Sequence, residues 1–215
     1  RDHGFVPRDI TSAAVNDAST RTSKATDPAL TEGDAAAALF TGTATSAIEA
    51  ADNVTQLVIT VSNVTDGADE IINIDGTAVA LTDTNSGSTG NSFGYSVALS
   101  GSTATVTVTH AGATTASIQT LVDGFAYQNT NENPTVASRV VTLTSISDDG
   151  GVANSGVDTT ALSIASTVTV TAVNDTPTTS GIADVTVLEA RDHIGGRIRS
   201  DPFGGVGIGP CIPRV

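Results

Sequence analysis

The sequence predicts an all-β fold, an antiparallel β-sandwich with one short crossover helix. Many short runs alternate apolar and polar residues with a period of two, Gly and Asp turns separate them, and a single segment has helical periodicity. The composition agrees: aromatic residues are 3% of the chain and Met and Trp are absent, so the core must consist mainly of Val, Ile, Leu and Ala. A β-barrel is the main structural alternative.

The predicted strands are short and several are joined as hairpins. Asp75-Gly76 supplies the positive φ angles of a tight hairpin within 70–81, and Ser100-Gly101-Ser102 joins a second hairpin. In chain order, the predicted strand regions are 55–61, 70–81, 93–99, 104–108, 139–146 and 160–173.

One segment has the spacing of an amphipathic helix. Apolar residues recur at i, i+3, i+4 and i+7, which places them on one helical face; they are Ile118, Leu121, Val122 and Phe125. We therefore expect a short helix over 115–125 that crosses between strands.

The end of the last predicted strand marks a domain boundary. Residues 160–173 show the period-two alternation of a half-buried strand and would extend ~46 Å at about 3.3 Å per residue. The alternation stops at Asn174-Asp175, and Pro177 cannot donate to a sheet, so the sheet is expected to end there.

A short self-match suggests a repeated unit. Val15-Asn16-Asp17 and Val173-Asn174-Asp175 are 158 positions apart, and a Leu and a Glu follow each motif within about fifteen residues. We therefore interpret 19–176 as one β-sandwich unit and 1–18 as an N-terminal segment or the end of a preceding repeat. Residues 177–215 are then a Gly- and Pro-rich tail or the start of a next unit.

The acidic charge lies in the middle of the chain. Residues 25–190 contain 18 Asp and Glu against one basic residue, Arg139. This argues against nucleic-acid binding, which needs a cationic surface. The acidic body fits either a solvated surface or one that collects hard cations such as Ca²⁺. No stretch has the length of a membrane span, so membrane insertion is not expected.

The motifs resemble the cadherin-like tandem repeats of large bacterial surface proteins and adhesins. The resemblance covers about residues 15–188, and it is carried by 168–177 with its Val-Asn-Asp-x-Pro ending, by 125–129 and by 139–143. It implies an Ig-like or cadherin-like sandwich that is extracellular or at the cell surface. It also implies head-to-tail repetition with Ca²⁺ at the junctions.

The same resemblance implies a set of metal ligands. Asn174 and Asp175 match the linker between repeats, and Glu32 with Asp34 resembles the acidic pair near the start of a repeat. Two further ligand positions of cadherin linkers hold Ala172 and Thr176 here, so we expect one ion rather than a cluster. Simple turn chemistry is the alternative role for Asn174-Asp175.

The tail carries a second resemblance. Residues 185–200 look like the flavin-binding segment of amine oxidases, which implies that Glu189 binds the adenosine ribose and that Gly195, Gly196 and Arg197 lie beside the pyrophosphate. The upstream Gly-x-Gly-x-x-Gly turn that such a site needs is absent.

Three functional hypotheses follow. The first is a non-enzymatic extracellular structural or adhesion module, a spacer repeat whose partners are neighbouring repeats, copies of itself, or cell-surface or matrix ligands. The second is an extracellular filament subunit joined through its terminal segments. The third is a fragment of a flavin-dependent amine oxidase.

Overall fold

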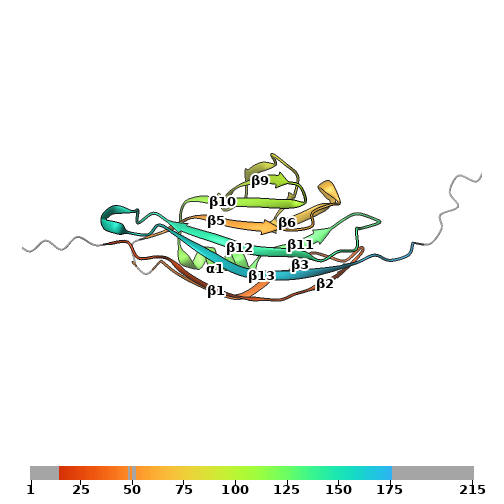
Figure 1. The fold of residues 1–215 in the computed structure, drawn as a ribbon, viewed down its shortest axis with the longest axis horizontal. Coiled ribbons are helices and arrows are strands. Elements are labelled where there is room, and N and C mark those ends of the chain that lie inside the picture. The colour runs from red at the N-terminus through yellow and green to blue at the C-terminus, as the bar shows by residue number, and fades with distance from the viewer. Residues whose placement is uncertain (1–14, 48, 50–51, 176–215) are drawn as a thin grey trace, which may run out of the picture. The chain divides into compact units, whose positions relative to one another are not determined.

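A computed structural model of the 215-residue chain describes residues 15–47, 49 and 52–175. Their β-sandwich with one short α-helix confirms the predicted fold class (Figure 1). One compact unit ends at Asn174, and Asp175 opens a second unit. The strands are β1 (Thr20–Ala25), β2 (Ala29–Thr31), β3 (Ala37–Ala38), β4 (Phe40–Ser46), β5 (Val54–Val61), β6 (Glu70–Ile74), β7 (Thr77–Ala80), β8 (Ser86–Ser88), β9 (Gly94–Ser100), β10 (Thr103–Ala113), β11 (Ala126–Asn129), β12 (Arg139–Asp148) and β13 (Thr159–Thr171). The helices are α1 (Thr115–Asp123) and two short 3-10 helices, η1 (Gly67–Asp69) and η2 (Ala153–Ser155).

The strands form two main sheets and a smaller one. The larger sheet has seven strands in the order β2-β13-β12-β5-β10-β9-β8, and the second has four in the order β3-β11-β6-β7. Strand β1 pairs with β4 in a separate two-stranded sheet. Among the described pairs, only β2 and β13 run parallel, and their pairing joins an early strand of the unit to its last strand.

Both predicted hairpins are present. Strands β6 and β7 join through Asp75 and Gly76, which adopt positive φ angles of 51° and 74°. Strands β9 and β10 join at a turn that contains Gly101, with a φ of 59°.

The core follows from the period-two alternation that the sequence shows. In β5, Leu57, Ile59 and Val61 are buried while the residues between them are half-exposed. The same parity buries Val168 and Val170 of β13. One continuous apolar cluster joins these side chains to those of the second sheet and of α1.

Helix α1 is two residues shorter than predicted. It begins after Thr114, whose Oγ1 accepts a hydrogen bond from the Ser117 amide at 3.2 Å. It ends at Asp123, because Phe125 leaves the helix to bury its ring, and the Phe125 carbonyl accepts a hydrogen bond from the Leu39 amide.

The unit has two distinct ends, which we call the entry end and the exit end. At the entry end, the Val157 amide donates to the carbonyl of Asn16 at 2.9 Å. At the exit end, the Val173 amide donates to Oε2 of Glu32 at 2.8 Å. Residues 157 and 173 flank β13, so the entry and exit of the chain are separated by the length of this strand, roughly 50 Å.

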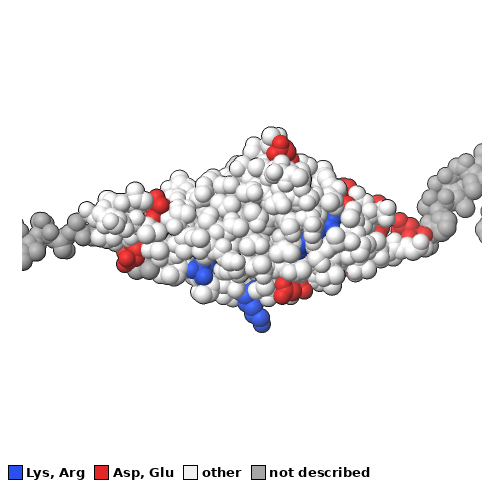
Figure 2. All heavy atoms as spheres, viewed as in Figure 1, with Lys and Arg blue, Asp and Glu red and all other residues white. Residues whose placement is uncertain are grey.

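The one basic residue of the acidic body is fully buried. The Arg139 guanidinium forms ion pairs with Glu70 and Asp66 at 3.0 and 2.9 Å, and Tyr127 donates to Glu70. Burial opposes ionisation of Asp66, but hydrogen bonds from Thr135 and Asn129 and the nearby Arg139 charge lower its pKa below the ordinary value. This network ties the loop before β12 to the start of β6. On the face shown in Figure 2, acidic side chains form several separate groups rather than one patch.

Candidate functional site

Asn16 is the centre of a polar cluster at the entry end. It is only 8% exposed, and its Nδ2 donates to three acceptors, which are Oδ1 of Asp148 at 2.9 Å, the carbonyl of Gly151 at 3.2 Å and the carbonyl of Val157 at 2.8 Å. Three acceptors around one nitrogen fix the orientation of the amide group.

The opposite atom of the same amide group, Oδ1, is buried and accepts no hydrogen bond among the described residues. A side chain at Gly150 would overlap both this oxygen and Oδ2 of Asp52, so the two oxygens face the same point beside the Gly150 backbone. Asn16 Oδ1 is a buried acceptor without a hydrogen bond, which is costly, and Asp52 is half-exposed; an amide oxygen and a carboxylate oxygen that face one point are the kind of pair that a cation satisfies.

Glu49 adds a third oxygen to the cluster. Its Oε1 accepts from the Asp17 amide at 3.2 Å, whereas its Oε2 is buried and has no partner among the described residues. Glu49 and Asp52 also line a cavity of about 240 Å³ beside β4 and the start of α1. We call Asn16, Glu49, Asp52 and Asp148 the entry cluster.

The carboxylates of the entry cluster repel one another. Burial raises the pKa of the Asp52 carboxyl, and the carboxylates of Glu49, Asp148 and Asp149 raise it further. Asp148 accepts three hydrogen bonds, from Asn16, from the Gly150 amide and from the Ser19 hydroxyl. Asp148 therefore orients Asn16, while Asn16, Glu49 and Asp52 offer the oxygens that remain.

Neighbouring acidic residues at the end of β12 have different partners. Asp149 is a turn residue, since its oxygens accept from the backbone amide and the side chain of Asn53, and these bonds lower its pKa. Asp148, by contrast, belongs to the entry cluster.

The ligands predicted from the sequence lie at the exit end. Glu32 accepts from the Val173 amide, and Asp34 accepts from the Thr31 amide at 2.8 Å within its own turn. One carboxylate oxygen of Glu32 lies within 4.8 Å of one of Glu132. Asn174 follows Val173 and is exposed, and Asp175, also exposed, belongs to the second unit.

The predicted set therefore contains none of the entry cluster, although one signal pointed to it. The self-match equates Asn16 with Asn174, so Asn16 was available as a candidate. Glu49 and Asp52 precede a strong strand, but nothing in their spacing links them to residue 16 before the chain is folded.

Comparisons with known proteins add one finding. The family model described as "Flavin containing amine oxidoreductase" matches residues 178–209, which is well under half of the chain. Glu189, Gly195, Gly196 and Arg197, the residues of the flavin resemblance, all lie in this segment and outside the described residues. The searches of curated proteins and of solved structures found no match. In the described part of the chain, α1 has nine residues and no helix is long and apolar enough to span a membrane.

Proposed function

We propose that this chain is a non-enzymatic extracellular module, a spacer repeat of a larger surface protein. The observation that carries the proposal is the separation of the entry and exit ends by the length of β13, with a Val-Asn-Asp motif at each. A unit of this kind adds length to a tandem array, in line with the resemblance to cadherin-like repeats. Catalysis has no part in this role.

The strand order suits a unit under tension. Strand β2 lies parallel to β13, and tension applied at residues 15 and 173 pulls these two strands in opposite directions along their length. Their hydrogen bonds are then loaded together in shear rather than one at a time. The Glu32 bonds to Thr171 and Val173 extend this pairing to the exit end.

We further propose that the entry cluster binds Ca²⁺. Calcium takes oxygen ligands from carboxylates and amide carbonyls, and Asn16, Glu49 and Asp52 present both types. A bound ion satisfies the buried oxygens and removes the repulsion among the carboxylates. It also links the incoming segment at Asn16 to Glu49 and Asp52, which stiffens the entry end of the unit.

Thermal unfolding of the full chain in CaCl₂ and in EGTA tests the cation. At 100 times the dissociation constant, an ion that binds only the folded state contributes about 2.7 kcal/mol. This amounts to an increase in Tm of roughly 5–10 °C for a domain of this size. Asp52→Asn is expected to abolish the increase, and Glu32→Gln to retain it.

The two variants show whether the ion binds at the entry end or at the exit end of the unit. Loss of the calcium effect in Glu32→Gln alone assigns the ion to the exit end, as the sequence first suggested. An equal Tm in CaCl₂ and EGTA for the unmodified chain contradicts a calcium site at either end.

Electron microscopy of the native parent protein tests the spacer role. Rods with a period on the order of 50 Å are expected, since each unit contributes about one β13 length. Isolated compact particles contradict the proposal. Polymers assembled from separate copies support instead the filament alternative, whose terminal segments are 1–18 and 190–215; of these, 1–14 and 190–215 lie outside the described residues.

A flavin-binding segment is the second candidate function, and the family match to 178–209 is what favours it. The absorbance spectrum of the purified protein tests it directly. A flavin spectrum that co-purifies with the chain supports this candidate, and a spectrum without one counts against it.

A further inference from the structure

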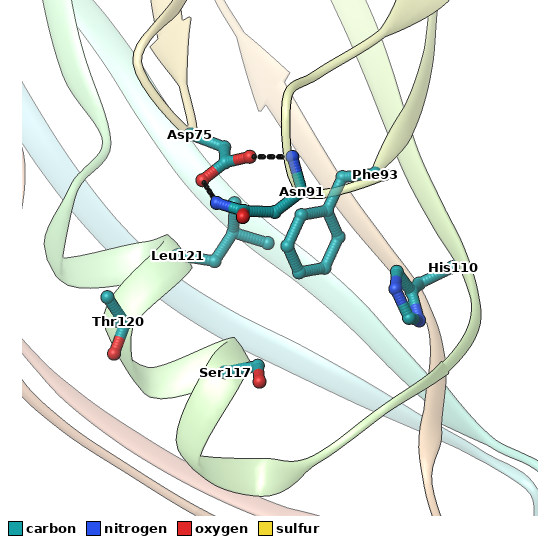
Figure 3. Close-up of a pocket in the computed structure, with 7 residues that line it drawn as sticks. All are labelled: Asp75, Asn91, Phe93, His110, Ser117, Thr120 and Leu121. Atoms are coloured by element: carbon teal, nitrogen blue, oxygen red, sulfur yellow. Dashed lines mark hydrogen bonds between the residues drawn. The ribbon is translucent and has the colours of Figure 1, made fainter.

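A second cavity lies on the other side of α1 from the two-stranded sheet and has a volume of about 290 Å³. The helix forms one wall, and the turns around Asp75 and Asn91 form the other (Figure 3). Its lining residues are Asp75, Asn91, Phe93, His110, Ser117, Thr120 and Leu121. None of them belongs to the entry cluster.

The cavity has an apolar part and a polar rim. Phe93 and Leu121 are buried members of the hydrophobic core, and the His110 ring lies 4.9 Å from the Phe93 ring, centroid to centroid. Hydroxyl, amide and carboxylate groups surround them, from Ser117 and Thr120 on the helix and from Asp75 and Asn91 on the turns. Such a cavity suits a small ligand with one apolar face and a polar edge.

Asp75 is an anionic hydrogen-bond acceptor, and its carboxylate is held in place by three hydrogen bonds. Its Oδ2 accepts from the Thr89 hydroxyl at 2.6 Å and from the Asn91 amide at 3.1 Å, and its Oδ1 accepts from Asn91 Nδ2 at 2.7 Å. The Thr89 bond, followed by those from Asn91, lowers the pKa of Asp75. A carboxylate has about four acceptor positions, so one remains for a ligand donor. The negative charge disfavours anionic ligands.

The remaining rim groups both donate and accept. The Nδ1 of His110 accepts from the Gly112 amide at 3.0 Å, so in the neutral ring Nε2 carries the proton and is a donor. Thr120 donates its hydroxyl proton to the Ala116 carbonyl and keeps its lone pairs as acceptors. Ser117 shares a hydrogen bond with the Thr114 hydroxyl, in which either can donate.

From this arrangement we infer that the cavity binds a neutral polyhydroxylated ligand, one sugar residue of a glycan. A pyranose has a C–H face that packs against aromatic and aliphatic side chains, and hydroxyls at its edge that donate and accept in turn. Asp75 accepts from a ligand hydroxyl, His110 donates to one, and Thr120 accepts from one. This inference concerns adhesion and is independent of the proposed spacer role and of the cation.

Saturation-transfer NMR and calorimetry on the full chain test the inference, with methyl glycosides of glucose, galactose, mannose and N-acetylglucosamine as probes. At least one is expected to bind at concentrations up to about 10 mM, an affinity that corresponds to only a few kcal/mol. The measurement is made in EGTA and again in CaCl₂, so that its outcome does not depend on the entry cluster.

Two matched variants of α1 locate the binding. Thr120→Phe fills the cavity from an exposed helix position and is expected to weaken glycoside binding at least tenfold with little change in Tm. Ala116→Phe adds the same ring at an exposed position of the helix that does not line the cavity, and binding should stay within twofold. No binding by any of the four probes, or equal binding by Thr120→Phe, overturns the inference.

Discussion

At the residue scale, Asn16 shows how one side chain is used twice. Its amide nitrogen fastens the entering chain to the loop after β12, while its oxygen faces Asp52 without a hydrogen-bond partner among the described residues. Turn chemistry alone accounts for the first role only. The position of this oxygen is what makes Asp52 the residue to substitute in a test of the proposed calcium site.

Asp52 gives a prediction about pH in the absence of calcium. Its folded-state pKa is raised, so its ionised form destabilises the fold at neutral pH, and this penalty declines as pH falls toward the unfolded value of about 3.9. In EGTA, Asp52→Asn is therefore expected to unfold at a higher urea concentration than the unmodified chain at pH 7. The difference should shrink as the pH approaches about 4. A less stable variant at pH 7 contradicts this assignment.

Arg21 is a second charged residue with an unfavourable environment. Its side chain is 7% exposed, and its three guanidinium nitrogens are buried without hydrogen-bond partners among the described residues. Burial lowers the pKa of Arg21 to about 10, against the opposing charge of Asp123. Among the described residues, no hydrogen bond offsets the free-energy cost of burying this charge.

Replacing Arg21 with Met should therefore stabilise the protein. Met keeps the length of the aliphatic stem and removes the buried charge, and changes of this kind contribute about 1–4 kcal/mol where they are favourable. Urea unfolding of Arg21→Met and of the control Arg21→Lys, which retains a charge, measures the effect. A loss of stability in the Met variant would show that the guanidinium has a partner in solution.

At the element scale, the β6–β7 hairpin depends on its turn. Asp75 and Gly76 both have positive φ, the conformation of the two-residue turns that match the twist of paired strands. Gly76→Ala is expected to cost about 1 kcal/mol, because an L-residue is strained at a φ of 74° although space is available for the methyl group. Gly90→Ala, at a position with equal space and no positive φ, should change stability by less than about 0.5 kcal/mol. Equal effects of the two substitutions in urea unfolding contradict the turn assignment.

Several of the strands that the sequence predicted have a buried face that the sequence alone indicates. Strands β5, β6, β12 and β13 alternate over five or more residues, so their buried faces are visible in the sequence. Strands β2 and β3 have three and two residues, too few for a period, and are defined by their pairing with β13 and β11. In β1, the alternation is hidden because its buried position holds Arg21.

The entry cluster could not be predicted from the sequence for a related reason. Asn16, Glu49, Asp52 and Asp148 come from three separate parts of the chain, and only the antiparallel sheet brings the end of β12 beside the start of β5. Asn174 and Asp175 became candidates because they follow the long strand directly, whereas Glu32 and Asp34 became candidates through the family resemblance. Local sequence patterns thus predict where strands end, whereas the pairing of distant strands determines which acidic residues lie close together.

At the scale of the whole molecule, screening of the acidic charge and the proposed calcium site are separate effects. The chain has a formal net charge of −14, and its one basic residue between positions 25 and 190 is buried in the Arg139 network, so it does little to offset the acidic surface. Self-repulsion of this kind is weakened by any salt, whereas a coordinated ion acts at one site.

These mechanisms predict two separable responses of the Tm. Sodium chloride should raise the Tm gradually as the Debye length falls from about 10 Å at 0.1 M to about 3 Å at 1 M. Calcium chloride should raise it further at millimolar concentrations and then saturate, because occupancy of a single site is complete. In 0.5 M NaCl, the calcium increment should persist for the unmodified chain and be absent for Asp52→Asn, which isolates coordination from screening. If 0.5 M NaCl removes the increment from the unmodified chain as well, calcium acts only as a counterion to the acidic surface.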